Sequence, residues 1–297
     1  MKIQTILQNN CSNIALVIGN GINLYGGARA TNSWHDLLVK LAKRNLPSSL
    51  RAVPRGVALT EYYDVLDLKS SKSKSTTPLQ QQFCDLMSSW QFYDHHKRIV
   101  EWAKDNNNPI LTTNFESVLS DAGGCTLRRT RKGGFTDYYP WESYYSSRDV
   151  SDPSHDFGIW HINGMQHYRR SVRLGLSHYM GSVERARTWL HKGNERRLFS
   201  GKNTRGWDGA DTWLHVIFNT PLLIFGLGLE ENEVFLRWLL IERARYFKKF
   251  PARKKDAWYI STDETNADGK KFFLDGVGIK FVYANDYGDI YGTEIWR

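Results

Sequence analysis

The sequence predicts an open, mainly parallel α/β sheet with helices on both faces and a smaller helical insertion module. A short apolar run, a glycine-rich turn and a helix follow one another twice, near residues 14–44 and 222–247. Continuous apolar runs of this length are typical of parallel strands, which are buried on both faces. The alternation of strands and helices favours crossover connections within a single sheet.

The first unit begins with a strand expected over Ile14 to Gly19. Ser33 is expected to cap the next helix, because its side chain can accept a hydrogen bond from a free N–H of the first turn. Apolar residues follow at helical spacing: Trp34, Leu37, Leu38 and Leu41. The helix is expected to stop before Pro47.

Residues 48–78 are mixed in character, and 70–78 (SSKSKSTTP) form a low-complexity segment for which an exposed loop is favoured over an anion contact. A long helical region is expected to follow. Its apolar members are Phe83, Leu86, Met87, Trp90, Ile99, Val100 and Trp102. Pro109 ends it, and Ile110 and Leu111 begin a second strand that leads into Thr112-Thr113-Asn114.

Residues 123–156 show no clear period and are expected to form an insertion or part of the smaller module. Further strands are expected over 157–162, 222–225, 257–260 and 279–283, and helices over 178–192, 207–219 and about 231–247. The last helix has glutamates at its start and basic residues at its end, which complements the helix dipole. We expect one domain over 1–297. Its core would comprise about 10–47, 105–122, 157–178 and 220–297, and its module about 48–104, 123–156 and 179–219.

The composition indicates a soluble globular protein with a basic surface. Hydrophobic residues make up 41% and charged residues 24% of the 297 residues, which argues against disorder, collagen repeats and coiled-coil arrays. The formal net charge is +9 and the pI is about 9.3. This excess favours contact with nucleic acid, a nucleotide or an acidic partner, without choosing among them.

The cysteines Cys11, Cys84 and Cys125 are scattered and form no C-x-x-C pair. They predict neither a zinc site nor a disulfide framework, and a reducing cytoplasm fits this usage. The N-terminal residues MKIQTILQNNCSN are too polar for a signal peptide. Apolar stretches fall far short of the roughly 20 residues of a membrane-spanning helix.

Two glycine-rich turns are candidates for close approach of a ligand. One is Gly19-Asn20-Gly21-Ile22-Asn23, and the other is Gly226-Leu227-Gly228-Leu229. Glycines let the backbone approach a pyrophosphate, and a following helix N-terminus favours negative charge. The first turn departs from the G-x-G-x-x-G spacing, so a tight turn without a ligand explains it about as well.

Polar residues end two further strands. Thr113, Asn114 and Glu116 follow the strand at 110–111, and His161 lies in the segment WHING. Carboxyl ends of parallel strands face the ligand crevice of an open sheet, where an amide can position a water and a histidine can act as a base. The competing interpretations are a helix cap for Asn114 and a structural role for His161.

Taken in order, these segments resemble the Sir2-like superfamily. The segments are GNGIN, SWHDLL, ILTTNFE, WHING, RLGLSHY and LLIFGLGLEENEV. The resemblance is closer to the zinc-free Sir2-like NADase domains of bacterial anti-phage defence systems, of the Sir2–HerA type, and covers roughly residues 14–240. It implies a Rossmann-like NAD+ site between a large domain and a helical module.

The resemblance also implies roles for individual residues. Asn114 and His161 match the family's catalytic pair. The implied NAD+-binding residues are Gly19, Asn20, Gly21, Asn23, Thr113, Glu116, Gly226, Gly228 and Leu229. Glu116 stands where aspartate is usual, and Ile162-Asn163 separate His161 from the glycine that usually follows it.

The family's deacylating members carry two C-x-x-C pairs that hold zinc. Because this chain has none, NAD+ cleavage with water is favoured over deacylation, and no zinc is expected. The nicotinamide–ribose bond breaks through an oxocarbenium-like state, so the site must exclude bulk water and fix one water near the sugar. Asn114 is expected to orient that water, and His161 to hold the ribose hydroxyls or act as a base.

We therefore expect an NAD+ hydrolase that acts as a defence effector in the cytoplasm. The resemblance implies control by homo-oligomerisation or by a separate partner, such as a HerA-like hexameric ATPase or an Argonaute-like protein. A nucleic-acid-binding or nuclease subunit is the second hypothesis, favoured by basic stretches at 128–132, 169–173, 185–187 and 243–255. An NAD-binding scaffold without turnover is the third.

Overall fold

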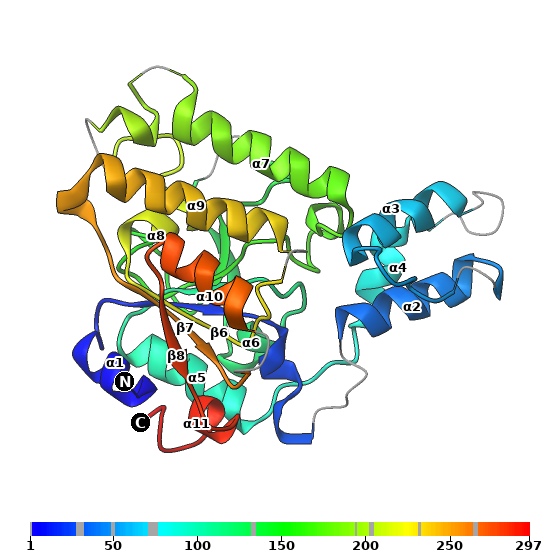
Figure 1. Ribbon diagram of the computed structural model, residues 1–297, viewed down its shortest axis with the longest axis horizontal. Helices are drawn as coiled ribbons and strands as arrows, with labels where there is room; N and C mark the ends of the chain where they lie inside the picture. Colours follow the sequence, from blue (N-terminus) through cyan, green and yellow to red (C-terminus); the bar gives the residue numbers. More distant parts are fainter. Residues whose placement is uncertain are drawn as a thin grey trace.

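The computed structural model describes residues 2–27, 33–48, 51–70, 77–131, 135–193, 195–201, 205–230, 233–263 and 267–297. They form an eight-stranded sheet with helices on both faces, and a smaller helical lobe projects from one end (Figure 1). The expected fold class is confirmed. Within the described ranges, no helix combines the length and the apolar character needed to cross a membrane.

The sheet is mainly parallel. In sheet order its strands are β3 (Thr126–Arg129), β4 (Ser143–Ser146), β5 (Ile159–His161), β2 (Ile110–Thr112), β1 (Ala15–Ile18), β6 (Leu222–Phe225), β7 (Ala257–Ser261) and β8 (Lys280–Tyr283). Strand β4 runs antiparallel to both neighbours. The other six strands, β5, β2, β1, β6, β7 and β8 in sheet order, pair in parallel. Numbered among themselves, these six parallel strands have the order 3-2-1-4-5-6 of dinucleotide-binding folds.

Helices cover both faces of the sheet. They are α1 (Ile3–Asn9), α2 (Trp34–Asn45), α3 (Leu59–Lys69), α4 (Leu79–Leu86), α5 (Asp94–Asp105), α6 (Val118–Ala122), α7 (Leu176–His191), α8 (Trp213–Asn219), α9 (Val234–Lys249), α10 (Ala267–Gly276) and α11 (Gly288–Tyr291). One face packs against α7, α8, α9 and α10, and the other against α1, α5 and α11 (Figure 1). Strand β1 supplies both cores, because Ala15 and Val17 face one side while Leu16 and Ile18 face the other.

The smaller lobe consists of α2, α3 and α4 and has its own apolar core with Leu38, Leu41 and Phe83 at its centre. Helix α2 begins after Ser33, whose Oγ accepts the Asp36 N–H at 3.1 Å, so the expected cap is confirmed. Helix α3 was not predicted from the sequence. Most of the polar segment 70–78 lies outside the described residues.

Three expectations about the middle of the chain are wrong. The long helical region is divided into α4 and α5, because the Tyr93 N–H is accepted by His96 Nδ1 and a new helix begins there. Helix α5 packs on the sheet rather than in the lobe. Segment 123–156 is not a separate insertion, since it supplies β3 and β4 at the sheet edge.

Candidate functional site

A cavity of about 410 Å³ opens at the carboxyl ends of β1, β2, β6 and β7. Three pairs or groups of residues at strand ends line this cavity: Asn20 and Gly21 after β1, Thr113 and Asn114 after β2, and Gly226 to Gly228 after β6. Its size lies within the range of small-molecule sites, about 300–1,000 Å³. Strands β1 and β6 are neighbours at the point where the strand order reverses, which is where open α/β sheets bind ligands.

The two glycine turns pack directly against each other. The N–H of Gly19 donates to Phe225 O at 3.0 Å, and the N–H of Gly21 donates to Gly226 O at 2.6 Å. A Cβ on Gly21 would lie 2.8 Å from Gly226 O, and one on Gly19 would lie 2.2 Å from Leu227 Cβ. Both glycines are therefore required by turn packing, whatever else they contact.

The helix expected after the first turn begins at Trp34, as α2, and the four-residue 3-10 helix η1 (Asn20–Asn23) directly follows β1. Because η1 places Asn23 toward the protein interior, that side chain is 3% exposed and its hydrogen bonds run behind the cavity wall.

The lobe supplies an apolar wall to the cavity. Trp34 and Leu37 come from α2, Phe83 comes from α4, and Met87 and Trp90 follow α4. Polar residues line other parts of the same cavity, including Asn163, Glu233 and Tyr259. The arrangement suits a ligand with an aromatic ring at one end and several hydrogen-bonding groups.

Glu116 is the most constrained polar residue of the cavity. Its Oε1 accepts a hydrogen bond from Asn23 Nδ2 at 2.5 Å. The Oδ1 of Asn23 lies 3.0 Å from His96 Nε2, and His96 Nδ1 accepts the Tyr93 N–H at 3.1 Å. Since Nδ1 accepts, Nε2 must carry the imidazole proton and donate to Asn23. This chain of hydrogen bonds fixes the orientation of the Asn23 amide and aims its N–H at Glu116.

Burial of the Glu116 carboxyl raises its pKa to about 7, and the hydrogen bond from Asn23 opposes the rise. Its second oxygen, Oε2, is buried and has no hydrogen-bond partner within the described part of the chain. A buried polar atom without a partner is costly and is characteristic of functional sites. At neutral pH this carboxyl can therefore either accept or donate a proton.

Asn114 and His161 are in direct contact, but only Asn114 reaches the cavity. His161 Nδ1 donates to the Asn114 backbone carbonyl at 2.7 Å, and burial lowers the imidazole pKa to about 4. Its Nε2 is buried, without a partner among the described residues, and His161 does not line the cavity. Asn114 does line it, and its Nδ2 likewise lacks a partner in the described ranges.

The structure distributes the sequence-predicted site residues between the cavity surface and the layer behind it. Those on the surface are Asn20, Gly21, Thr113, Asn114, Glu116, Gly226 and Gly228. Those behind it are Gly19, Asn23, His161 and Leu229. Leu229 has a positive φ of 49° and points into the apolar core.

Sequence reasoning missed three residues that matter here: His96, Asn163 and Glu233. Glu233 precedes α9 and lines the cavity, where burial raises its pKa to about 7. The Asn163 carboxamide Oδ1 is another buried atom without a partner in the described residues. The available signal for Asn163 was its place two residues after the β5 strand; His96 gave none, because its partner Asn23 is 73 residues away.

The described residues contain no group of three or more His, Cys, Asp or Glu side chains that could hold a metal ion. A comparison of the sequence with protein-family models and with curated proteins finds no match.

Proposed function

We propose that this chain is an NAD+ hydrolase that cleaves the nicotinamide–ribose bond and acts as an effector of anti-phage defence. The observation that carries the proposal is the Glu116 carboxyl at the β1/β6 switch point. It is buried, one oxygen is held by Asn23, and the other has no hydrogen-bond partner among the described residues. Together with the resemblance of the motifs to Sir2-like NADases, this favours hydrolysis over passive binding.

The chemistry of the cavity fits such a substrate. The aromatic wall from the lobe can enclose a nicotinamide ring and exclude bulk water. Three buried atoms have no hydrogen-bond partner in the described part of the chain: Asn114 Nδ2, Glu116 Oε2 and Asn163 Oδ1. They offer one donor and two acceptors for sugar hydroxyls, a carboxamide or a water. The strand order is that of dinucleotide-binding folds.

In the proposed reaction, water adds to C1′ of the ribose while nicotinamide leaves with the bonding electron pair as a neutral molecule. The water loses one proton, and the Glu116 carboxylate accepts it. Its negative charge also stabilises the oxocarbenium-like state, since electrostatic stabilisation is strong in a site that excludes water. Asn114 orients the water or the ribose.

His161 has a different role in this proposal from the one expected from the sequence. It lies behind the cavity wall and donates to the Asn114 carbonyl. We therefore assign it as a positioning residue that holds Asn114 in place. Regulation by a homo-oligomer, or by a partner such as a HerA-like ATPase or an Argonaute-like protein, belongs to the same proposal and rests on the resemblance.

The test is NAD+ consumption, followed by chromatography of nicotinamide and ADP-ribose, for the chain alone and with the product of its neighbouring gene. Glu116→Gln is expected to lose at least about a hundredfold in rate. The matched control is Glu101→Gln, an exposed change on α5. Calorimetry with ADP-ribose separates binding from turnover. An active protein in which Glu116→Gln cleaves at the wild-type rate, or binding of ADP-ribose without turnover in any assembly, contradicts the proposal.

A further inference from the structure

A second concave surface lies at the amino ends of the parallel strands, on the side of the sheet opposite the cavity mouth. It is a groove of about 690 Å³ between the end of α9, the segment that leads into β7, and the end of α10. Helix α9 begins beside Glu233 at the cavity and runs for 16 residues to Lys249. At 1.5 Å per residue, this places the groove on the order of 24 Å from the cavity.

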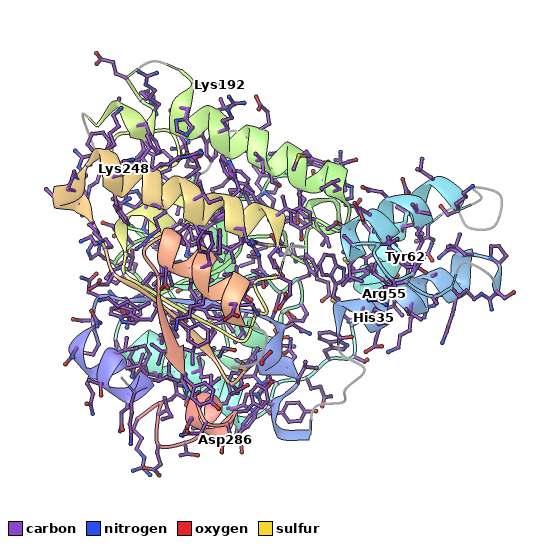
Figure 2. All side chains as sticks on the ribbon, viewed as in Figure 1. His35, Arg55, Tyr62, Lys192, Lys248 and Asp286 are labelled. Carbon is purple, nitrogen blue, oxygen red and sulfur yellow. The ribbon has the colours of Figure 1, made fainter. Side chains whose placement is uncertain are left out.

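The groove is strongly basic. Residues 248–255 read KKFPARKK and contain five cations and no acid. Lys248, Lys254 and Lys255 line the groove, and their ammonium groups have no ion-pair or hydrogen-bond partner among the residues that the structure describes. Figure 2 shows Lys248 at the end of α9 that lies farthest from the smaller lobe.

The other cations of this region are already engaged. Arg243 donates to the backbone carbonyls of Ile217, Thr220, Lys255 and Asp256, so it is a buried structural residue. Arg245 pairs with Glu242 at 2.5 Å. Asp275 is the acid that lines the groove. The lysines thus exceed the local acidic charge and remain available to an external anion.

Lysine chemistry distinguishes the two main classes of anionic partner. Protein–protein interfaces are depleted in lysine, because a flexible, strongly hydrated ammonium is costly to bury. Nucleic-acid backbones, by contrast, are bound through such point charges, which release condensed counterions as they neutralise phosphates. A concave surface with three lysines that have no partner among the described residues therefore fits a phosphate backbone better than an acidic protein.

We propose that this basic groove, lined by Lys248, Lys254 and Lys255, binds the phosphate backbone of duplex nucleic acid without sequence preference. The inference is independent of the proposed NAD+ chemistry, because it rests on residues at the amino ends of the strands, away from the cavity. The groove is a binding surface that leaves the mouth of the cavity open.

The test measures fluorescence anisotropy of a short labelled DNA duplex of mixed sequence, titrated with the full chain from about 50 to 200 mM salt. The variant Lys248→Glu/Lys254→Glu is expected to bind at least about tenfold more weakly at the low end. Its log–log salt slope should be smaller by about 2, since two phosphate contacts are lost. The control Lys43→Glu/Arg44→Glu makes the same change in net charge on α2, outside the groove, and should bind within about twofold of wild type.

Three results would overturn the inference. The wild-type chain fails to bind the duplex at low salt, or the α2 control loses as much affinity as the groove variant, or poly-glutamate binds the groove while DNA does not. The last result would indicate an acidic protein partner. Thermal unfolding of both variants verifies that each is folded, which the exposure of all four substituted residues favours.

Discussion

The buried carboxyl of Glu116 makes folding stability depend on pH in a defined direction. Its pKa rises from 4.5 to about 7 on folding. Between these values the unfolded chain loses its proton first, so the free energy of unfolding falls as pH rises, by about 3 kcal/mol in total. Glu116→Gln removes this titration. In urea denaturation, the free energy of unfolding of the variant relative to wild type should increase by about 3 kcal/mol between about pH 4.5 and 7.5. If the two proteins show parallel pH profiles, the raised pKa of Glu116 is contradicted.

His96 should control the same carboxyl from a distance. His96→Phe removes the donor to the buried Asn23 Oδ1, which is then left unsatisfied at a cost of about 1–3 kcal/mol, and it also removes the acceptor of the half-buried Tyr93 N–H. Once the Asn23 amide is free to turn, Glu116 loses its hydrogen bond and its pKa should rise further above 7. A carbon-13 NMR titration of labelled glutamate measures that shift directly.

The control for this experiment is His35→Phe on the exposed surface of α2 (Figure 2). It should change stability by less than about 0.5 kcal/mol and leave the Glu116 titration where it is. A His96 variant that is destabilised while Glu116 still titrates near 7 would show that His96 supports the fold alone and does not position the carboxyl.

At the scale of elements, the β1 and β6 turns depend on the absence of a side chain. Gly21→Ala would place a methyl group 2.8 Å from Gly226 O, so one turn must move. We expect a loss of about 1–3 kcal/mol. Gly269→Ala, in the open part of α10, meets no atom within 4 Å and should gain up to about 1 kcal/mol, because alanine favours the helix. Chemical denaturation of the two variants separates the packing of the turns from helix propensity. If both variants change stability by the same amount, the clash expected at Gly21 is contradicted.

The elements that sequence reasoning found are those with strong local signals. Strands β1 and β6 are continuous apolar runs, and α2 has both its cap and its helical spacing. Strand β3 was missed because its residues, TLRR, are exposed or half-exposed at the sheet edge and carry no apolar pattern. The site was predictable only in part. Glycine turns and strand ends marked its edges, but Glu116 and Asn23 meet across 93 residues, and only tertiary packing places His96 behind them.

At the scale of the whole molecule, the cavity lies at the carboxyl ends of the parallel strands and the basic groove at their amino ends. Helix α9 connects them, with Glu233 before its first turn and Lys248 in its last. Arg243 ties the middle of this helix to four backbone carbonyls of α8, the turn after it and the start of β7. A helix anchored in this way is a rigid spacer and favours two sites that act separately.

Binding at the two sites should therefore be nearly additive. For well-separated positions that share no partner, coupling free energies stay within about 0.5 kcal/mol, which corresponds to roughly a twofold change in affinity. Saturating ADP-ribose should change the dissociation constant of the DNA duplex by no more than that. Reciprocity requires the same factor when the duplex is added to an ADP-ribose titration. Anisotropy and calorimetry measure the two directions independently. A change of tenfold or more in both would instead show that α9 or the sheet moves between two arrangements, and would make nucleic acid a direct regulator of the cavity.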